Sequence, residues 1–165
     1  MLLTIFLALV CCGAITCLLI AAVAFVQELR FFSSAPKEVR LLLKPRKKDL
    51  FYGARTFGWV MIVFSILAIS GALCIAVWDG LRCGYSFTQF FLRFALILTI
   101  YKIYDMVFFD WFLLCKFHFF QYYYPETEPA LSGRKYGFNI RSQLLKLLVI
   151  FPAVSALAAW ICIQF

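Results

Sequence analysis

Charged residues are scarce in this sequence, and the common motifs of an enzyme are missing. Asp, Glu, Lys and Arg make up 15% of the chain, against about 25% in soluble domains. Its single histidine, His118, excludes bis-histidine haem ligation and a histidine-rich metal centre. The seven cysteines form no CxxC pair, and no phosphate-binding loop, GxSxG or HExxH motif occurs. We therefore expect no catalytic residue, metal or cofactor, and an enzyme is the less favoured class.

Apolar side chains are abundant instead. They make up 65% of the 165 residues and include 20 Phe, 8 Tyr and 4 Trp, which is more apolar ring surface than a soluble protein can cover. About 20 apolar residues in a helix cross a bilayer, and four stretches reach that length. The sequence predicts an all-α polytopic membrane protein, one domain over residues 1–165, with a bundle of four transmembrane helices and short loops. The predicted spans cover about residues 2–26, 57–78, 88–115 and 143–165.

The first apolar stretch has two readings. Leu2 to Val26 carries no charged residue, and its 25 residues would extend about 37 Å as a helix, enough to cross the bilayer with a tilt. A cleaved signal peptide is the alternative, because Ala22-Val23-Ala24 has the small residues of a cleavage site. The stretch lacks a basic start and is long for a signal peptide. We expect it to be retained as a span.

Glycine and proline predict where the later helices end or bend. Asp79-Gly80 is a turn signal, so the second span is expected to end at Trp78. Pro152 lies inside the fourth span and has no backbone donor. It should kink that helix and leave the carbonyl of Leu148 to find another partner.

The positive charges predict the orientation. Half of the 16 basic residues fall between Arg30 and Arg55, and the segment 116–142 adds four more. The loop between the second and third spans contains only Arg82. Basic loops stay on the cytoplasmic side, so loops 27–56 and 116–142 are predicted to be cytoplasmic and both termini outside. No nucleic-acid-binding signature accompanies the net charge of +8, and we expect no nucleic-acid partner.

The first basic loop contains a predicted amphipathic segment. Pro36 can open a short helix and Pro45 can stop it. Leu and Val side chains between them alternate with cations, a pattern typical of a segment lying in the headgroup region. Its partners are expected to be the bilayer and anionic phospholipid headgroups, at about 1 kcal/mol per basic residue. The predicted lipid contacts are Lys37, Arg40, Lys44, Arg46, Lys47 and Lys48.

The third span carries the candidate functional residues. At about 100° per residue, Asp105 projects about 60° from Lys102 on one side, and Asp110 about 80° on the other. Thr99 falls within the same arc, whereas Arg93 projects from the opposite face. Thr99, Lys102, Asp105 and Asp110 therefore form a predicted polar stripe. Ionisable residues inside a membrane usually face the bundle interior or a water-filled cavity.

The stripe leaves more than one function open. It can be a buried ion pair, Lys102 with Asp105, that fixes helix register, or a polar pathway for protons, ions or a small solute. Because four helices offer few walls for a water path, the leading hypothesis is a small membrane protein that acts as a homo-oligomer or with other membrane subunits and forms such a pathway. The alternatives are a non-transporting scaffold or assembly protein and, less favoured, a membrane thiol-redox or lipid-modifying enzyme.

Overall fold

In the computed structural model the chain folds into helices alone across the residues described, which are 1–32, 35–44, 50–131, 133 and 140–164. Segments η1, η3 and η5 are π-helical, and η2 and η4 are short 3₁₀ helices. The elements in chain order are α1 (Leu2–Ile20), η1 (Ala21–Val26), η2 (Leu29–Phe32), α2 (Lys37–Leu42), α3 (Ala54–Arg82), α4 (Phe87–Tyr104), η3 (Asp105–Lys116), α5 (Phe119–Tyr123), η4 (Pro125–Thr127), α6 (Glu128–Leu131), α7 (Ile140–Leu145), η5 (Lys146–Ile150) and α8 (Phe151–Cys162).

Three helices are long and apolar enough to cross a membrane. They run over Leu2–Val26, Ala54–Arg82 and Ile140–Cys162, which match the first, second and fourth predicted spans to within a few residues. The third predicted span is also helical, as α4 followed directly by η3. It is not among the three, and ionisable residues interrupt its apolar sequence. The chain is thus an all-helical protein with three apolar helices of membrane-crossing length.

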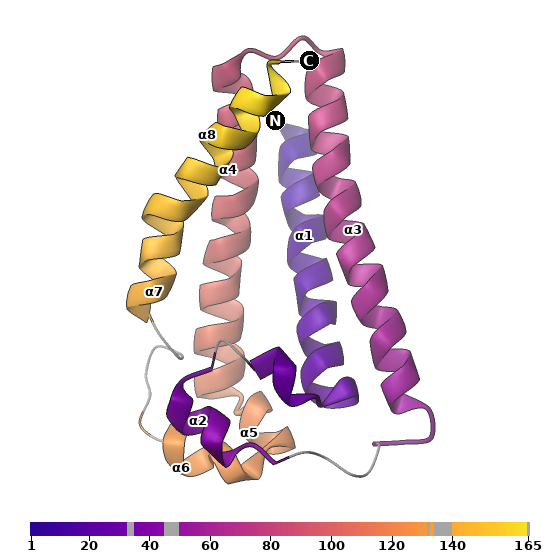
Figure 1. Cartoon of the computed structure of the whole chain (residues 1–165), viewed down its shortest axis with the longest axis vertical. Helices are drawn as coiled ribbons and strands as arrows, with labels where there is room; N and C mark the ends of the chain where they lie inside the picture. Colours follow the sequence, from indigo (N-terminus) through magenta and orange to yellow (C-terminus); the bar gives the residue numbers. More distant parts are fainter. Residues whose placement is uncertain (33–34, 45–49, 132, 134–139, 165) are drawn as a thin grey trace.

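The long helices stand side by side in the order α3, α1, α4, α8 (Figure 1). The most extensive packing is of α1 on α3 and of α4 on α8, and α1 also packs on α4. The main core lies along these contacts and includes Leu7, Ala76, Phe90, Phe94 and Ile97. Both termini and the turn from α3 to α4 lie at one end of the row.

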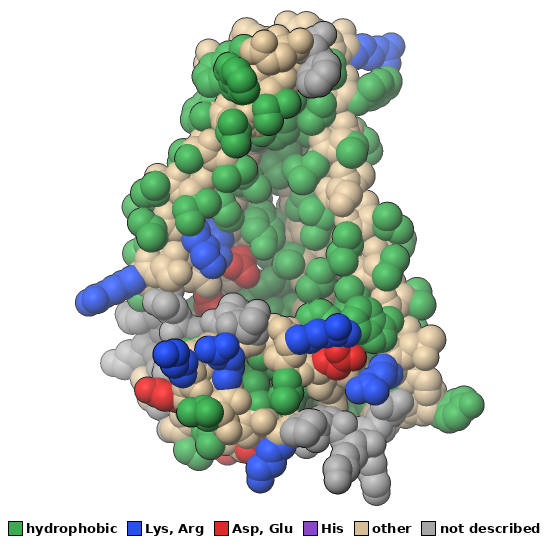
Figure 2. Space-filling model, viewed as in Figure 1, with side chains coloured by type: hydrophobic (Ala, Val, Ile, Leu, Met, Phe, Trp, Pro, Cys, Tyr) green, Lys and Arg blue, Asp and Glu red, His purple; other side chains and the backbone are tan. Residues whose placement is uncertain are grey.

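The outer helices α3 and α8 make almost no contact with each other. Only 22% of the most apolar stretch of α3 and 11% of that of the last helix are buried in the chain. The space-filling view is hollowed between these two helices, and basic and acidic side chains meet at the lower end of the hollow (Figure 2). The row is therefore open along one side.

The short segments form a cap at the other end of the row. Segments η2, α2, α5, η4 and α6 gather there (Figure 1). Val39 of α2 is fully buried in an apolar cluster with Phe120 and Tyr124, and the rings of Phe32 and Phe120 meet edge to face with centroids 5.1 Å apart. The predicted helix exists; Val39 and Leu43 pack on protein, whereas Leu41 and Leu42 are exposed.

The predicted lipid contacts on this segment remain untested. Lys37, Arg40 and Lys44 are exposed, and so is Leu41. Their side chains are therefore available to a headgroup region. Arg46, Lys47 and Lys48 lie outside the described residues.

The predicted turn at Asp79-Gly80 is wrong, because α3 continues through both residues to Arg82. Gly80 is inside the helix, where it lets Phe90 of α4 approach closely: a Cβ on Gly80 would lie 2.3 Å from Cε1 of Phe90. The turn comes later, at Gly84, whose φ of 62° favours glycine. The dipeptide that resembles a turn thus serves helix packing.

Pro152 lies inside the continuous helix Ile140–Cys162, directly after its π-helical turn. It stands in the first turn of α8, and the preceding segment η5 is π-helical, with the Phe151 N–H donating to the Lys146 carbonyl five residues back. Pro152 has no backbone N–H to donate. The π-helical turn before it shifts the neighbouring hydrogen bonds to a spacing of five residues, which accommodates the missing donor. The backbone hydrogen bonds are rearranged at the predicted place, and the kink of the helix axis stays a prediction.

The contact at Gly80 can be tested against a matched glycine of the same helix. In Gly80→Ala the new methyl must displace the buried Phe90 ring, and overpacking of this kind costs about 1–3 kcal/mol. Gly71 has no atom within 4 Å of an added Cβ, so Gly71→Ala should raise stability by about 0.5–1 kcal/mol. Thermal unfolding in detergent measures both, and Phe90→Leu should partly rescue Gly80→Ala. Equal shifts for the two alanine variants would contradict the packing role.

Candidate functional site

Lys102, Asp105 and Asp110 of the polar stripe line a partly open cavity of about 330 Å³. The cavity lies at the end of the helices that faces the cap, between η1, the α4–η3 helix, the α7–η5 helix and α5. Its polar lining consists of Tyr101, Lys102, Asp105, Asp110, Ser142, Gln143 and Lys146. Leu, Val and Phe side chains form the remaining wall. Two basic and two acidic side chains thus share one small space.

Lys102 and Asp105 form an ion pair within their own helix. The Lys102 Nζ donates to Oδ2 of Asp105, at the three-residue spacing that brings helical side chains together. The Lys102 side chain is 6% exposed and that of Asp105 is 21% exposed. A buried ammonium needs such a partner, because an uncompensated charge is costly in a low-dielectric interior.

Asp110 finds its partner on another helix. The Nε2 of Gln143 donates to Oδ2 of Asp110 at 3.1 Å. The Oε1 of Gln143 is buried, and no described residue donates to it. Lys146 follows one turn later, lines the same cavity and forms no ion pair with any described acidic residue. The last helix therefore supplies both an amide and a cation to the stripe.

The π-helical segment explains why both aspartates reach the same cavity. In an α-helix Asp105 and Asp110 would point about 140° apart. In η3 the hydrogen bonds run between residues five apart, as in the 2.8 Å bond from the Phe117 N–H to the Phe112 carbonyl. Residues five apart then lie one turn above each other. Because the π-helical turn contains more residues, the Asp110 side chain points closer to the direction of the Asp105 side chain.

All three π-helical segments border this cavity. Val23 of η1, Asp105 and Asp110 of η3, and Lys146 of η5 belong to its lining. Single π turns inside α-helices are rare and occur frequently at functional sites. Their meeting at one place makes this cavity the candidate functional site.

Thr99 does not join the cavity, so its place in the predicted stripe needs correction. It lines a second cavity, of about 500 Å³, with Met1, Thr4, Tyr85 and Arg93. The helical projection gave Thr99 and Asp110 the same side of Lys102. Because η3 turns Asp110 towards Asp105, the first cavity opens on the Asp105 side and Thr99 remains on the other.

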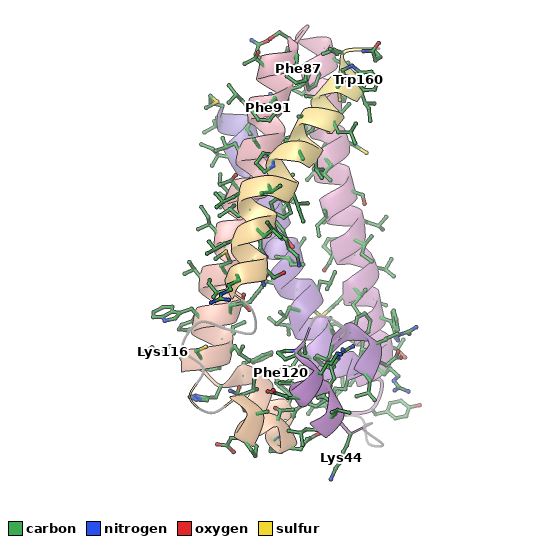
Figure 3. The ribbon with its side chains drawn as sticks, turned by 60° about the vertical axis from the view of Figure 1, so that its left-hand side comes forward. Lys44, Phe87, Phe91, Lys116, Phe120 and Trp160 are labelled. Carbon is green, nitrogen blue, oxygen red and sulfur yellow. The ribbon has the colours of Figure 1, made fainter. Side chains whose placement is uncertain are left out.

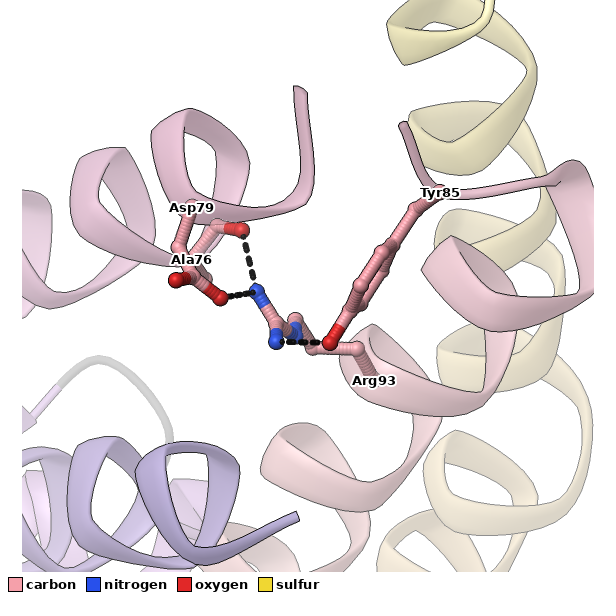
Figure 4. A network of polar contacts seen from close by, with 4 residues as sticks. All are labelled: Ala76, Asp79, Tyr85 and Arg93. Carbon is pink, nitrogen blue, oxygen red and sulfur yellow. Dashed lines mark hydrogen bonds and ion pairs between the residues drawn. The ribbon is translucent and has the colours of Figure 1, made fainter. Parts of the chain in front are cut away.

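Arg93 is held in a separate polar network (Figure 4). Its side chain is 3% exposed, and its Nη1 contacts Oδ2 of Asp79 at 2.7 Å and the carbonyl of Ala76 at 2.9 Å. Its Nη2 donates to the Tyr85 hydroxyl at 2.6 Å. The guanidinium thus joins the end of α3 to α4, beside the turn that connects them. This network has a structural role in holding the two helices together.

Sequence reasoning missed the contribution of the last helix. Gln143 and Lys146 are three residues apart at the start of a strongly apolar stretch, the same spacing as Lys102 and Asp105. That spacing was a usable signal for one polar helix face. The sequence does not predict that this polar face packs against the third helix.

No described group of three or more His, Cys, Asp or Glu side chains could hold a metal ion. No family model matches the chain, and neither curated proteins nor solved structures include a significant match. The assignment of a function therefore depends on the geometry of the cavity.

A double-mutant cycle tests the ion pair. Lys102→Met and Asp105→Leu each leave one buried charge without its partner, and each should destabilise the protein by about 3–5 kcal/mol. The double variant should recover most of that loss, because no unpaired charge remains. Urea or thermal unfolding in detergent gives the three values. Additive losses in the double variant would mean that the two side chains do not interact.

Proposed function

We propose that this chain is a four-span membrane protein that acts as an oligomer or as a subunit of a membrane complex, and that its cavity belongs to a polar pathway for protons, ions or a small solute. The observation that carries the proposal is that polar groups from two helices meet in one cavity: Lys102, Asp105 and Asp110 from one helix, and Gln143 and Lys146 from the other. If Lys102 and Asp105 only fixed the register of their helix, neither the polar groups of the last helix nor the cavity would be needed.

Several features favour the α4–η3 helix as the remaining span. The 18 residues of α4 alone would extend about 27 Å, and the 12 residues of η3 lengthen the helix further, so together they are long enough for a hydrocarbon core of about 30 Å. Neighbouring helices cover it on two sides, α1 and α8. Phe87, Phe91 and Trp160 lie near one end of the helices, and Lys116 and Phe120 near the other (Figure 3), as aromatic and basic residues do at membrane interfaces.

The two cavities along α4 support a pathway that is closed in this conformation. One opens beside Arg93 and Thr99, near the termini, and the other surrounds Lys102 near the cap. The two linings share no residue, and Leu7 and Cys11 of α1 belong to one buried apolar cluster with Ile97 of α4. A solute that crosses would need these helices to separate. The exposed faces of α3 and α8 are available to the other subunits of an oligomer or complex.

The orientation can be tested with a native cysteine. The proposal places the α3–α4 turn outside and loops 27–56 and 116–142 in the cytoplasm. Exposed Cys83 should then react with a membrane-impermeant maleimide in intact cells. An engineered Tyr52→Cys, at a fully exposed loop position, should react only after permeabilisation. The Cys83→Ser variant measures the background labelling of the other cysteines. Labelling of both sites in intact cells would contradict four spans with this orientation.

Flux measurements test the pathway itself. Proteoliposomes of the purified chain should pass protons after an acid pulse, read with an entrapped pH-sensitive dye. Asp110→Asn keeps the size of the side chain but removes its charge, and it should lower the flux about tenfold or more, equivalent to a barrier rise of about 1.4 kcal/mol. Glu128→Gln, an exposed site in the cap, is the matched control.

The folded double variant Lys102→Met/Asp105→Leu separates pathway from scaffold. Loss of flux in a variant that keeps its unfolding temperature supports the pathway. Full flux in that variant would leave the pair a structural role, and no flux in any preparation, with potassium or sodium gradients included, would favour the scaffold alternative.

A further inference from the structure

The second cavity, near the termini, contains a buried donor that the contacts between the helices do not use. Arg93 lines this cavity of about 500 Å³, and its side chain is 3% exposed. The Nη1 and Nη2 atoms of its guanidinium contact Asp79, Ala76 and Tyr85. The Nε–H is buried, and no described residue accepts a hydrogen bond from it. Because an unsatisfied buried donor costs free energy, we expect the Nε–H to meet an acceptor that does not belong to the chain.

The unused Nε–H lies on the side of the guanidinium that contacts Tyr85. In the planar guanidinium, Nε–H and one N–H of Nη2 point along the same edge. Nη2 donates to the Tyr85 hydroxyl (Figure 4), and Tyr85 lines the cavity, whereas Asp79 and Ala76 do not. Because the Tyr85 oxygen accepts from Nη2, its own hydrogen can be donated to a further acceptor. The cavity therefore offers two neighbouring donors, and a carbonyl oxygen with its two lone pairs can accept from both.

The charges around Arg93 favour a neutral acceptor. Asp79 contacts Nη1 at 2.7 Å and balances the charge of the guanidinium. Among the described residues of the lining, Arg93 has the only charged side chain. A phosphate or carboxylate at the Nε–H would add a negative charge without a partner, which is costly in a low-dielectric setting. An ester carbonyl accepts the same hydrogen bonds without adding charge.

The remainder of the cavity suits a hydrocarbon chain. Leu92, Ala95 and Leu96 of α4 line it, and Thr4 and Thr99 add hydroxyl groups. Its volume falls within the roughly 300–1,000 Å³ of ligand pockets, which are mostly apolar with a few polar groups that fix the ligand. Leu92 is 60% exposed, so the cavity borders the outer surface of the bundle. A ligand can thus place one carbonyl group in the cavity while its apolar chains continue into the membrane.

The depth of Arg93 matches that of a phospholipid ester. Arg93 is the seventh residue of α4, so its Cα lies about 9 Å from the start of the helix. The interfacial layer outside the hydrocarbon core is about 5–8 Å thick on each side. With α4 starting in this layer, Arg93 lies close to the boundary of the hydrocarbon core. The ester groups of a phospholipid join its glycerol backbone to its acyl chains and therefore lie at the same boundary.

We propose that the cavity near the termini binds one phospholipid of the adjacent leaflet through an ester carbonyl, which accepts hydrogen bonds from the Nε–H of Arg93 and the hydroxyl of Tyr85. The attached acyl chain lies along Leu92 and Leu96. The inference rests on the proposed function in one respect, the placement of α4 as a membrane span. It does not require that protons or ions cross. A lipid in this cavity occupies the termini-side end of the proposed pathway, so it would have to leave when a solute crosses.

A pair of matched lipids tests the ester contact. Diester phosphatidylcholine and its diether analogue have the same headgroup and the same chain length, but only the diester has carbonyl groups. The purified full chain is titrated with each lipid in detergent, and native mass spectrometry measures the fraction of the chain that carries one lipid. The diether loses a hydrogen bond from a charged donor, so the diester should bind about tenfold more tightly. Diester phosphatidylglycerol should bind as tightly as diester phosphatidylcholine, because the contact does not involve the headgroup.

Two variants locate the binding in this cavity. Ala95→Phe fills the cavity and should weaken diester binding about tenfold, whereas Ala153→Phe, at an exposed position of α8 outside the described lining, should not. Arg93→Lys keeps a cation beside Asp79 but lacks the Nε–H, so the diester and the diether should bind about equally. This ratio is measured within one variant, and the lipid comparison on the unmodified chain needs no variant. The test therefore stays informative if Ala95→Phe fails to fold.

Two results would overturn the inference. Equal binding of the diester and the diether by the unmodified chain would mean that no ester carbonyl is recognised, and that water satisfies the Nε–H instead. A diester preference that persists in both Ala95→Phe and Arg93→Lys would place the lipid at another surface of the chain. If Cys83 and Tyr52→Cys label as proposed and proton flux persists, these failures leave the proposed function standing.

Discussion

The side chains of the α4–η3 helix impose the main constraint on this structure, because they bring charge into an otherwise apolar bundle. A buried charge without a partner is costly in a low-dielectric interior. Arg93 is offset by Asp79 and Tyr85, and Lys102 by Asp105. Asp110 depends on Gln143. The arrangement of the other helices follows from these requirements, since α3 must deliver Asp79 and the last helix must deliver Gln143.

The sequence predicts the helical class and the apolar helices well, for a simple physical reason. Long uncharged runs have one stable state in or beside lipid, a helix with its own backbone hydrogen bonds satisfied. It also predicts the pairing of Lys102 with Asp105, since neighbours three apart on a helix meet whatever surrounds them. The turn at Asp79-Gly80 was wrong because Gly80 is needed for the approach of Phe90, a tertiary contact that local turn preferences do not contain.

The cavity was harder to predict because it depends on a local change of helix type. A regular α-helix would have grouped Asp110 with Thr99, and the π-helical η3 groups it with Asp105. No residue in that segment signals the change, and we have no sequence rule for it. The partners Gln143 and Lys146 follow from how helices far apart in the chain pack together. Periodicity within one helix identifies a polar face, and packing decides what that face meets.

The hydrogen bond between Asp110 and Gln143 also bears on how the protein is made. The two residues are 33 positions apart, and the amide is the later one. At about 5–20 residues per second, a ribosome needs roughly 2–7 s to reach Gln143 after Asp110 has been added. During that interval α4 and η3 can pair Lys102 with Asp105, but Asp110 lacks the Gln143 amide that donates to it in the complete fold. The Asp110–Gln143 contact therefore forms only after the segment that carries Gln143 has been synthesised, and this part of the fold is completed last.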